Sequence, residues 1–218
     1  GPRMYRALSL LVFCGLSTGT STLPTVASQA GAIQTLGQGL GCTAGTCSWT
    51  YQTCWYGQNP LAGQNCTLDP CLGAWFGILC QPNAGGTAQV INVIFLGFNG
   101  MTGSLTGTAL AGLPDVTDFM IQNNAVQGAI PTQIGQMTKL INVYLFKNSF
   151  SGNLPTELGL LATLQKFDFS NNGISGPIPT TLAGLQNLTQ FTASYNNLNG
   201  QLPTQLATNP RLKLFYVD

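Results

Sequence analysis

Histidine is absent from the 218 residues, and only 6% of them carry a charge. Without histidine the chain has no Ser-His-Asp or Cys-His catalytic arrangement, no imidazole metal ligand and no general base with a pKa near neutrality. Seven basic and six acidic residues nearly cancel, so the net charge supplies no field to hold nucleic-acid phosphates. These absences argue against an enzyme, and we expect neither a cofactor nor a nucleic-acid partner.

The start of the chain has the pattern of a secretory leader. Two arginines precede the short apolar run at 7–16, and small residues follow it. This pattern predicts a signal peptide over residues 1–27, with the cleavage position left open and a buried N-terminal helix as the alternative. Two N-x-T sequons, at Asn65 and Asn187, fit such export as potential glycosylation sites. We therefore expect a secreted or cell-surface protein.

Cysteine is confined to the front of the chain. Apart from Cys14 in the predicted leader, all cysteines lie between Cys42 and Cys80. An even number of cysteines in an exported chain predicts three disulfides, although their connectivity cannot be deduced. A thiolate metal site is the alternative, but the C-x-x-C spacing of such sites is missing, so no metal is expected. The predicted disulfide cysteines are Cys42, Cys47, Cys54, Cys66, Cys71 and Cys80.

The remainder of the sequence repeats itself with a period of 24 or 25 residues. Apolar residues stand eight, five and three positions before a recurring asparagine, which gives the pattern L-x-x-L-x-L-x-x-N. The alternation predicts a short strand with one face inward, and successive strands are expected to pair in parallel. The asparagine amide can satisfy backbone groups of its own and of the neighbouring coil. The recurring asparagines are Asn99, Asn124, Asn148, Asn172 and Asn196.

Each asparagine is followed by a second motif, L-x-G-x-[IL]-P, as at residues 126–131. This extension resembles the plant-type leucine-rich repeat of receptor-like kinase ectodomains, polygalacturonase inhibitors and many protist surface proteins. The resemblance implies an α/β fold, a right-handed solenoid with a parallel sheet on its concave face. Residues 91–218 would supply five full repeats and the start of a sixth. The first repeat has Thr106 in place of proline and one extra residue, so its outer segment is expected to be irregular.

Residues 28–90 are expected to form a cysteine-rich cap, because a first coil without one would expose an apolar end. The segment at 75–80 resembles the W-x-G-V-x-C motif of the plant-type N-terminal cap, which implies that Cys71 pairs with Cys80. The other four cysteines exceed the usual pair of this family. Apolar residues over 33–40 have helical spacing and predict a short cap helix, although nearby glycines weaken that prediction.

A ligand site is expected on the concave face, where outward positions of successive strands stack about 4.8 Å apart. Apolar and aromatic residues cluster in the first three repeats, and lysines and an aspartate add charge. Such a cluster favours ligand binding, although aromatic residues also simply cover neighbouring strands. The candidate ligand-binding residues are Phe95, Phe98, Met120, Tyr144, Phe146, Lys147, Lys166, Asp168, Tyr195 and Tyr216.

A second regular array consists of four threonines that each follow a repeat proline, at positions 132, 156, 180 and 204. Threonine arrays can suggest ice binding. The alternative, which we favour, is that each threonine caps the start of a short helical turn by bonding its free N–H groups.

The function expected from these patterns is extracellular recognition of a protein, peptide or glycan, with no catalysis. The sixth repeat stops before its asparagine, so we expect the N-terminal fragment of a larger surface receptor, attached to a membrane only through the leader or a downstream segment. The alternative is a secreted inhibitor of cell-wall-degrading glycosidases. A kinase signature after an apolar stretch of about 20 residues would mark a receptor kinase.

Overall fold

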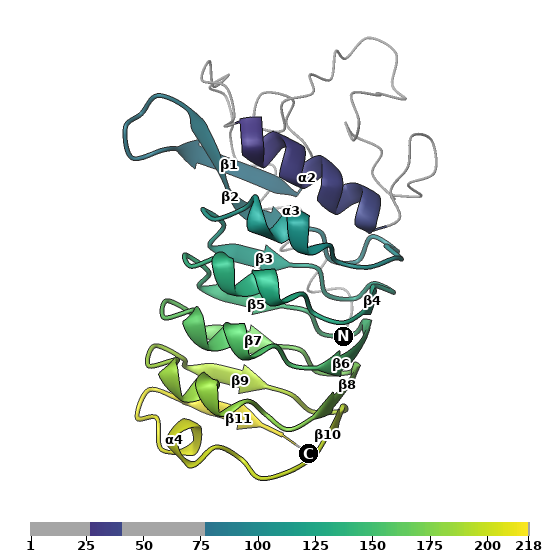
Figure 1. Ribbon diagram of the computed structural model, residues 1–218, viewed down its shortest axis with the longest axis vertical. Helices are drawn as coiled ribbons and strands as arrows, with labels where there is room; N and C mark the ends of the chain where they lie inside the picture. Colours follow the sequence, from purple (N-terminus) through teal and green to yellow (C-terminus); the bar gives the residue numbers. More distant parts are fainter. Residues whose placement is uncertain (1–26, 41–76, 218) are drawn as a thin grey trace, which may run out of the picture.

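The computed structural model describes residues 27–40 and 77–217, where the repeats form a stack of coils (Figure 1). Each coil adds one strand to a seven-stranded sheet of order β1-β2-β3-β5-β7-β9-β11. The pairs from β2 to β11 are parallel, and only β1 pairs antiparallel, with β2. These strands are β1 (Ile78–Pro82), β2 (Gln89–Phe95), β3 (Asp118–Met120), β5 (Asn142–Tyr144), β7 (Lys166–Asp168), β9 (Gln190–Thr192) and β11 (Leu214–Tyr216).

The apolar positions of the repeat form one continuous core. Side chains alternate across a strand, and the inward residues, such as Ile94, Phe119 and Val143, are fully buried in a single cluster. Further along the array, the ring of Phe169 lies 5.4 Å from that of Phe191 in the next coil, measured between centroids. Each coil therefore covers the apolar surface of the next.

The recurring asparagine joins neighbouring coils, as its amide chemistry predicts. Nδ2 of Asn148 donates to the carbonyl oxygens of Leu145 in its own coil and Ile121 in the preceding coil, both at 3.0 Å. Its Oδ1 accepts from the backbone N–H of Val126 at 3.1 Å. Equivalent bonds are made by the asparagines at 124, 172 and 196. Nδ2 of Asn99, in the first repeat, donates to Gly97 within its own coil.

A second, four-stranded parallel sheet forms where the chain turns away from the first (Figure 1). The motif glycines take positive φ angles there, such as 83° at Gly128 and 77° at Gly176. Glycine adopts this conformation without steric cost, which explains its place in the motif. The strands, in sheet order, are β10 (Asn197–Leu198), β8 (Gly173–Gly176), β6 (Ser149–Asn153) and β4 (Gln127–Gly128).

Short helical turns lie across the core from the seven-stranded sheet (Figure 1). The repeat proline, for example Pro131, occupies the N-cap. The threonine after it is the first residue of the helix, and no side-chain capping bond is formed. Our interpretation of these threonines as caps is therefore wrong, because they sit one position too late. The turns are α3 (Gly107–Ala111), η1 (Thr132–Gln136), η2 (Thr156–Leu160), η3 (Thr180–Gly184) and α4 (Thr204–Ala207).

The first repeat departs from the others, as its sequence predicts. Its outer turn α3 is α-helical and has Thr106 at the N-cap, whereas η1 to η3 are 3-10 helices. α3 also contacts the helix that precedes the array. The first repeat therefore differs in its N-cap residue, whereas helix type does not distinguish it, because α4 of the fifth repeat is also α-helical.

That preceding helix, α2 (Ala27–Gly39), covers the first coil. Its apolar side chains at Ile33 and Leu36, and Leu40 just after it, are buried in the common core, which confirms the predicted cap helix. Gly39 is required by a close approach, because a Cβ there would lie 2.7 Å from the carbonyl oxygen of Ser104.

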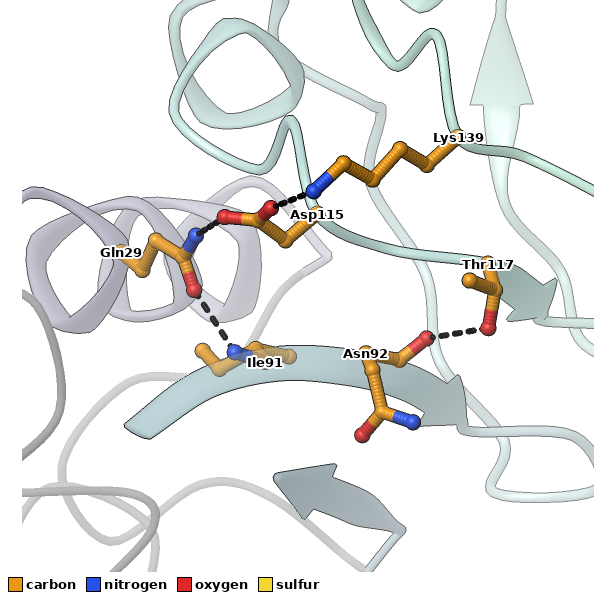
Figure 2. Close-up of polar contacts among 6 residues, drawn as sticks. All are labelled: Gln29, Ile91, Asn92, Asp115, Thr117 and Lys139. Carbon is orange, nitrogen blue, oxygen red and sulfur yellow. Dashed lines mark hydrogen bonds and ion pairs between the residues drawn. The ribbon is translucent and has the colours of Figure 1, made fainter. Parts of the chain in front are cut away.

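A series of polar contacts connects α2 to the first two repeats (Figure 2). Gln29 is only 2% exposed. Its Oε1 accepts from the backbone N–H of Ile91 on β2, and its Nε2 donates to Asp115, each at 2.6 Å. Asp115 in turn forms an ion pair with Lys139 of the next coil. Nothing in the sequence pattern singled out Gln29, because its partners are far along the chain.

The cysteine predictions fall mostly on residues outside the described part of the chain. Cys80, on β1, is disulfide-bonded, but Cys42, Cys47, Cys54, Cys66 and Cys71 all lie outside it. The three predicted disulfides therefore stay a prediction, as does the signal peptide.

Candidate ligand-binding face

The central column of the expected site forms in the predicted register. Phe95 pairs with Met120, Met120 with Tyr144, and Tyr144 with Asp168. The column continues through Thr192 to Tyr216 on β11. Because these residues alternate with buried ones, they lie on the outer face of the seven-stranded sheet, which is the solvent-facing side opposite the helical turns.

A second column lies two residues further along the chain than the central one, and it is less exposed than its position suggests. Its described residues are Gly97, Gln122, Phe146, Ser170 and Ser194, of which the first, second and fourth are buried. Gln122 is 7% exposed and its side chain covers Gly97, since a Cβ on that glycine would lie 2.7 Å from Gln122 Nε2. Among the described residues, Gln122 Oε1 finds no hydrogen-bond partner. One coil further, the ring of Phe146 meets that of Tyr144 edge to face at 6.3 Å. The second coil thus carries a buried amide oxygen without a partner, and the third carries a pair of aromatic rings in contact.

Beyond the strands, one residue per coil has a left-handed backbone, with φ between 54° and 62°. L-residues other than glycine and asparagine rarely adopt this conformation. Phe98 is nevertheless 57% and Tyr195 71% exposed, so these side chains extend into solvent. The sequence did not reveal the conformation, although asparagine at two of the five positions was a signal for it. We call these five residues the left-handed row: Phe98, Asn123, Lys147, Asn171 and Tyr195.

The charged candidates lie on different columns. Lys147 belongs to the left-handed row, whereas Lys166 lies at the other end of its strand, in register with Asn142 and Gln190. Asp168 lies in the central column, two residues after Lys166, and its Oδ1 accepts a hydrogen bond from the backbone N–H of Ser170 at 3.0 Å. The structure therefore places the two lysines at different positions along the strand direction.

All ten candidate residues thus lie on the sheet's outer face or in the turns that continue it. Five are exposed, namely Phe98, Lys147, Lys166, Tyr195 and Tyr216, and five are half-buried, namely Phe95, Met120, Tyr144, Phe146 and Asp168.

Of the two predicted glycosylation sites, only Asn187 lies among the described residues. Asn187 already uses its amide in the fold, since Nδ2 donates to the Ala162 carbonyl at 2.8 Å and Oδ1 accepts from Arg211. A glycan on Nδ2 would have to replace the first bond. Asn65 lies outside the described residues. Glycosylation at both positions stays a prediction.

Within residues 27–40 and 77–217 there is no cluster of potential metal ligands. In the same ranges, no helix has the length and hydrophobicity needed to cross a membrane.

Sequence comparison finds the repeat itself. A profile described as "Leucine Rich Repeat" matches residues 163–185. Pollen receptor-like kinase 6 of Arabidopsis thaliana is 40% identical over 63 residues, a stretch that covers 29% of this chain and 9% of that protein. The match therefore spans only a small part of the relative's length.

Solved structures extend the similarity to most of the chain. The leucine-rich-repeat ectodomain of the receptor kinase SOBIR1 from Arabidopsis thaliana superposes with a TM-score of 0.70 and 22% identity, covering 88% of this chain and 92% of that one. A chain of the BIR3–SERK2 complex from the same plant gives a TM-score of 0.63 and 22% identity, and the superposition covers 84% of this chain and 92% of that one. The chain is thus a leucine-rich-repeat solenoid with the fold of plant receptor-kinase ectodomains.

Proposed function

We propose that this chain is a non-catalytic recognition module that binds a peptide or protein through the outer face of its seven-stranded sheet. The observation that carries the proposal is the aromatic surface of the first three coils. Phe95, Met120 and Tyr144 are held in register by strand pairing, Phe146 meets the Tyr144 ring edge to face, and each of the four remains partly exposed. Contiguous apolar surface of this kind on a soluble domain is typical of an interaction site.

The dimensions of the face suit a short segment of chain. Six consecutive parallel strands, β2 to β11, span about 24 Å at about 4.8 Å per strand. An extended peptide rises about 3.3 Å per residue, so about seven residues would cover this length. The ligand would therefore cross all the coils rather than occupy a closed pocket.

The comparisons support this assignment at the level of protein class. The matched relatives are receptor-like kinases, one structural neighbour is a receptor-kinase ectodomain, and another was solved in a complex of two named proteins. In this proposal the chain lies outside the cell and forms the recognition part of a longer surface receptor. A glycan ligand and inhibition of a glycosidase are the competing functions.

A random-peptide library displayed on phage provides a direct test. The wild-type chain should enrich a defined set of peptides, and Phe95→Ala with Tyr144→Ala should weaken their binding while the melting temperature stays nearly unchanged. The matched control is Leu160→Ala, because Leu160 is an exposed apolar residue on the helical side.

Two results would contradict the proposal. One is retention of peptide binding by the Phe95/Tyr144 variant. The other is the absence of any enriched peptide, combined with inhibition of a fungal polygalacturonase by the wild-type chain, which would favour the inhibitor function instead.

A further inference from the structure

The left-handed row alternates in side-chain size along the array. Large side chains stand in the first, third and fifth coils, at Phe98, Lys147 and Tyr195, and asparagines stand in the two coils between them. Asparagine suits the left-handed backbone, whereas the three large residues adopt it against their preference. Because these three are exposed, their side chains do not serve the core. They are placed to contact something outside it.

The spacing of the row is fixed by hydrogen bonds that continue past the ends of the strands. Backbone N–H groups of Asn123, Lys147 and Asn171 each donate to a carbonyl of the next coil, at 3.0, 2.9 and 2.9 Å. Coils bonded in this way lie about 4.8 Å apart, so the large side chains recur about every 9.6 Å.

This interval matches one conformation of a peptide ligand. A polyproline II helix has three residues per turn and rises about 9.3 Å per turn, so it presents the same face at nearly this interval. Two turns of an α-helix rise about 10.8 Å. Over the two intervals from Phe98 to Tyr195, an α-helix would therefore be about 2.4 Å longer than the row. Over the same two intervals, a polyproline II helix would be only about 0.6 Å shorter than the row.

The charge and hydrogen-bonding groups of the row complete the description of the ligand. Within the described part of the chain, the Lys147 ammonium makes no ion pair, and the side-chain amides of Asn123 and Asn171 make no hydrogen bond. A polyproline II backbone has no internal hydrogen bonds, so its carbonyls are free to accept from such amides. An acidic side chain facing the central position would meet the Lys147 ammonium.

We propose that the left-handed row binds a proline-rich segment in the polyproline II conformation, with prolines against Phe98 and Tyr195 and an acidic residue opposite Lys147. The sequence preference is Pro-x-x-[Asp/Glu]-x-x-Pro, read at every third residue. Aromatic side chains recognise such preformed helices at low entropic cost. This proposal rests on the proposed peptide-binding function and specifies its ligand.

Fluorescence anisotropy with a labelled oligoproline of about nine residues, carrying one central glutamate, tests the proposal. The wild-type chain should bind it more tightly than the same peptide with a central lysine, and more tightly than a Gly-Ser peptide that keeps the glutamate but loses the helix. Equal affinity for all three peptides would overturn the proposal.

Asparagine substitutions provide matched variants, because asparagine already occupies the same position in alternate coils. Lys147→Asn should weaken binding of the glutamate peptide about threefold to fivefold, as for an exposed ion pair, and should abolish its preference over a glutamine peptide. Phe98→Asn combined with Tyr195→Asn should weaken binding about tenfold or more. Neither variant should lower the melting temperature, and Leu160→Ala should bind like wild type.

The failure of this proposal is distinguishable from failure of the proposed function. If library-selected peptides lack the proline and acid spacing, yet still depend on Phe95 and Tyr144, the polyproline proposal is wrong and the recognition function stands. If neither the library nor the oligoproline binds, the polyproline proposal is wrong, and inhibition of a fungal polygalacturonase by the wild-type chain would then overturn the recognition function as well.

Discussion

The side-chain amide of Gln29 donates a hydrogen bond to the carboxylate of Asp115, 86 residues further along the chain, at 2.6 Å. The same glutamine accepts from the Ile91 N–H, so one buried residue links the cap helix to β2 and to the segment that leads into β3 (Figure 2). The front of the solenoid is therefore held by specific polar contacts as well as by apolar burial.

Gln29→Met should lower the free energy of unfolding by about 1–3 kcal/mol, because the buried Ile91 N–H loses its partner. Chemical denaturation measures this difference. The matched variant Gln38→Met, on the exposed side of the same helix, should change stability by no more than about 0.5 kcal/mol. Equal effects of the two variants would mean that the Gln29 contacts contribute nothing specific.

Asn148→Leu should destabilise the array by about 3 kcal/mol or more, because a Val126 N–H and two carbonyls lose a buried partner together. Asn199→Leu is the control, since Asn199 is exposed and its side chain lies outside the ladder. Thermal melting followed by circular dichroism compares them. An unaltered melting curve for Asn148→Leu would contradict the role of the asparagine ladder.

Thr156→Ala should leave stability within about 0.5 kcal/mol of wild type, because the structure gives this threonine no capping bond. Thr163→Ala should instead cost about 1 kcal/mol, because its hydroxyl donates to the carbonyls of Leu140 and Thr138 in the preceding coil, at 2.7 and 2.9 Å. The free energy of unfolding decides between them. A loss of about 1 kcal/mol at Thr156 would restore the capping interpretation.

Lys147→Asn should stabilise the chain by about 0.5 kcal/mol, because asparagine tolerates a φ of 54° better than lysine does. Lys166→Asn should have the opposite sign, since Lys166 lies in the extended strand β7, where asparagine is unfavourable. Both lysines are exposed, so their difference isolates the backbone. If both variants shift the melting temperature in the same direction, the strain argument fails.

Much of the array could be predicted because its information is periodic and local. The apolar spacing before each asparagine placed the strands and the buried face, and the outward residue of each strand predicted the column from Phe95 to Tyr216. The repeat proline marked the start of each outer turn. These features follow from side-chain alternation and backbone preference, which act within one repeat and are copied from coil to coil.

The errors and omissions arose where geometry depends on exact position or on distant partners. Thr132 and its equivalents have the chemistry of N-caps, but the proline before them takes that position and leaves the hydroxyl one residue late. Lys147 and Lys166 were grouped by charge, yet strand register places them at opposite ends of the face.

The sequence by itself determined the period, the inward residues, the asparagine ladder and the family resemblance, because each rests on a pattern repeated several times within the chain. Only the tertiary structure decided that Gln29 joins the cap to Asp115, that Gln122 lies buried over Gly97, and that Phe98, Lys147 and Tyr195 extend from left-handed backbone. Those features depend on contacts between coils and on backbone angles, and both are set only when the coils stack.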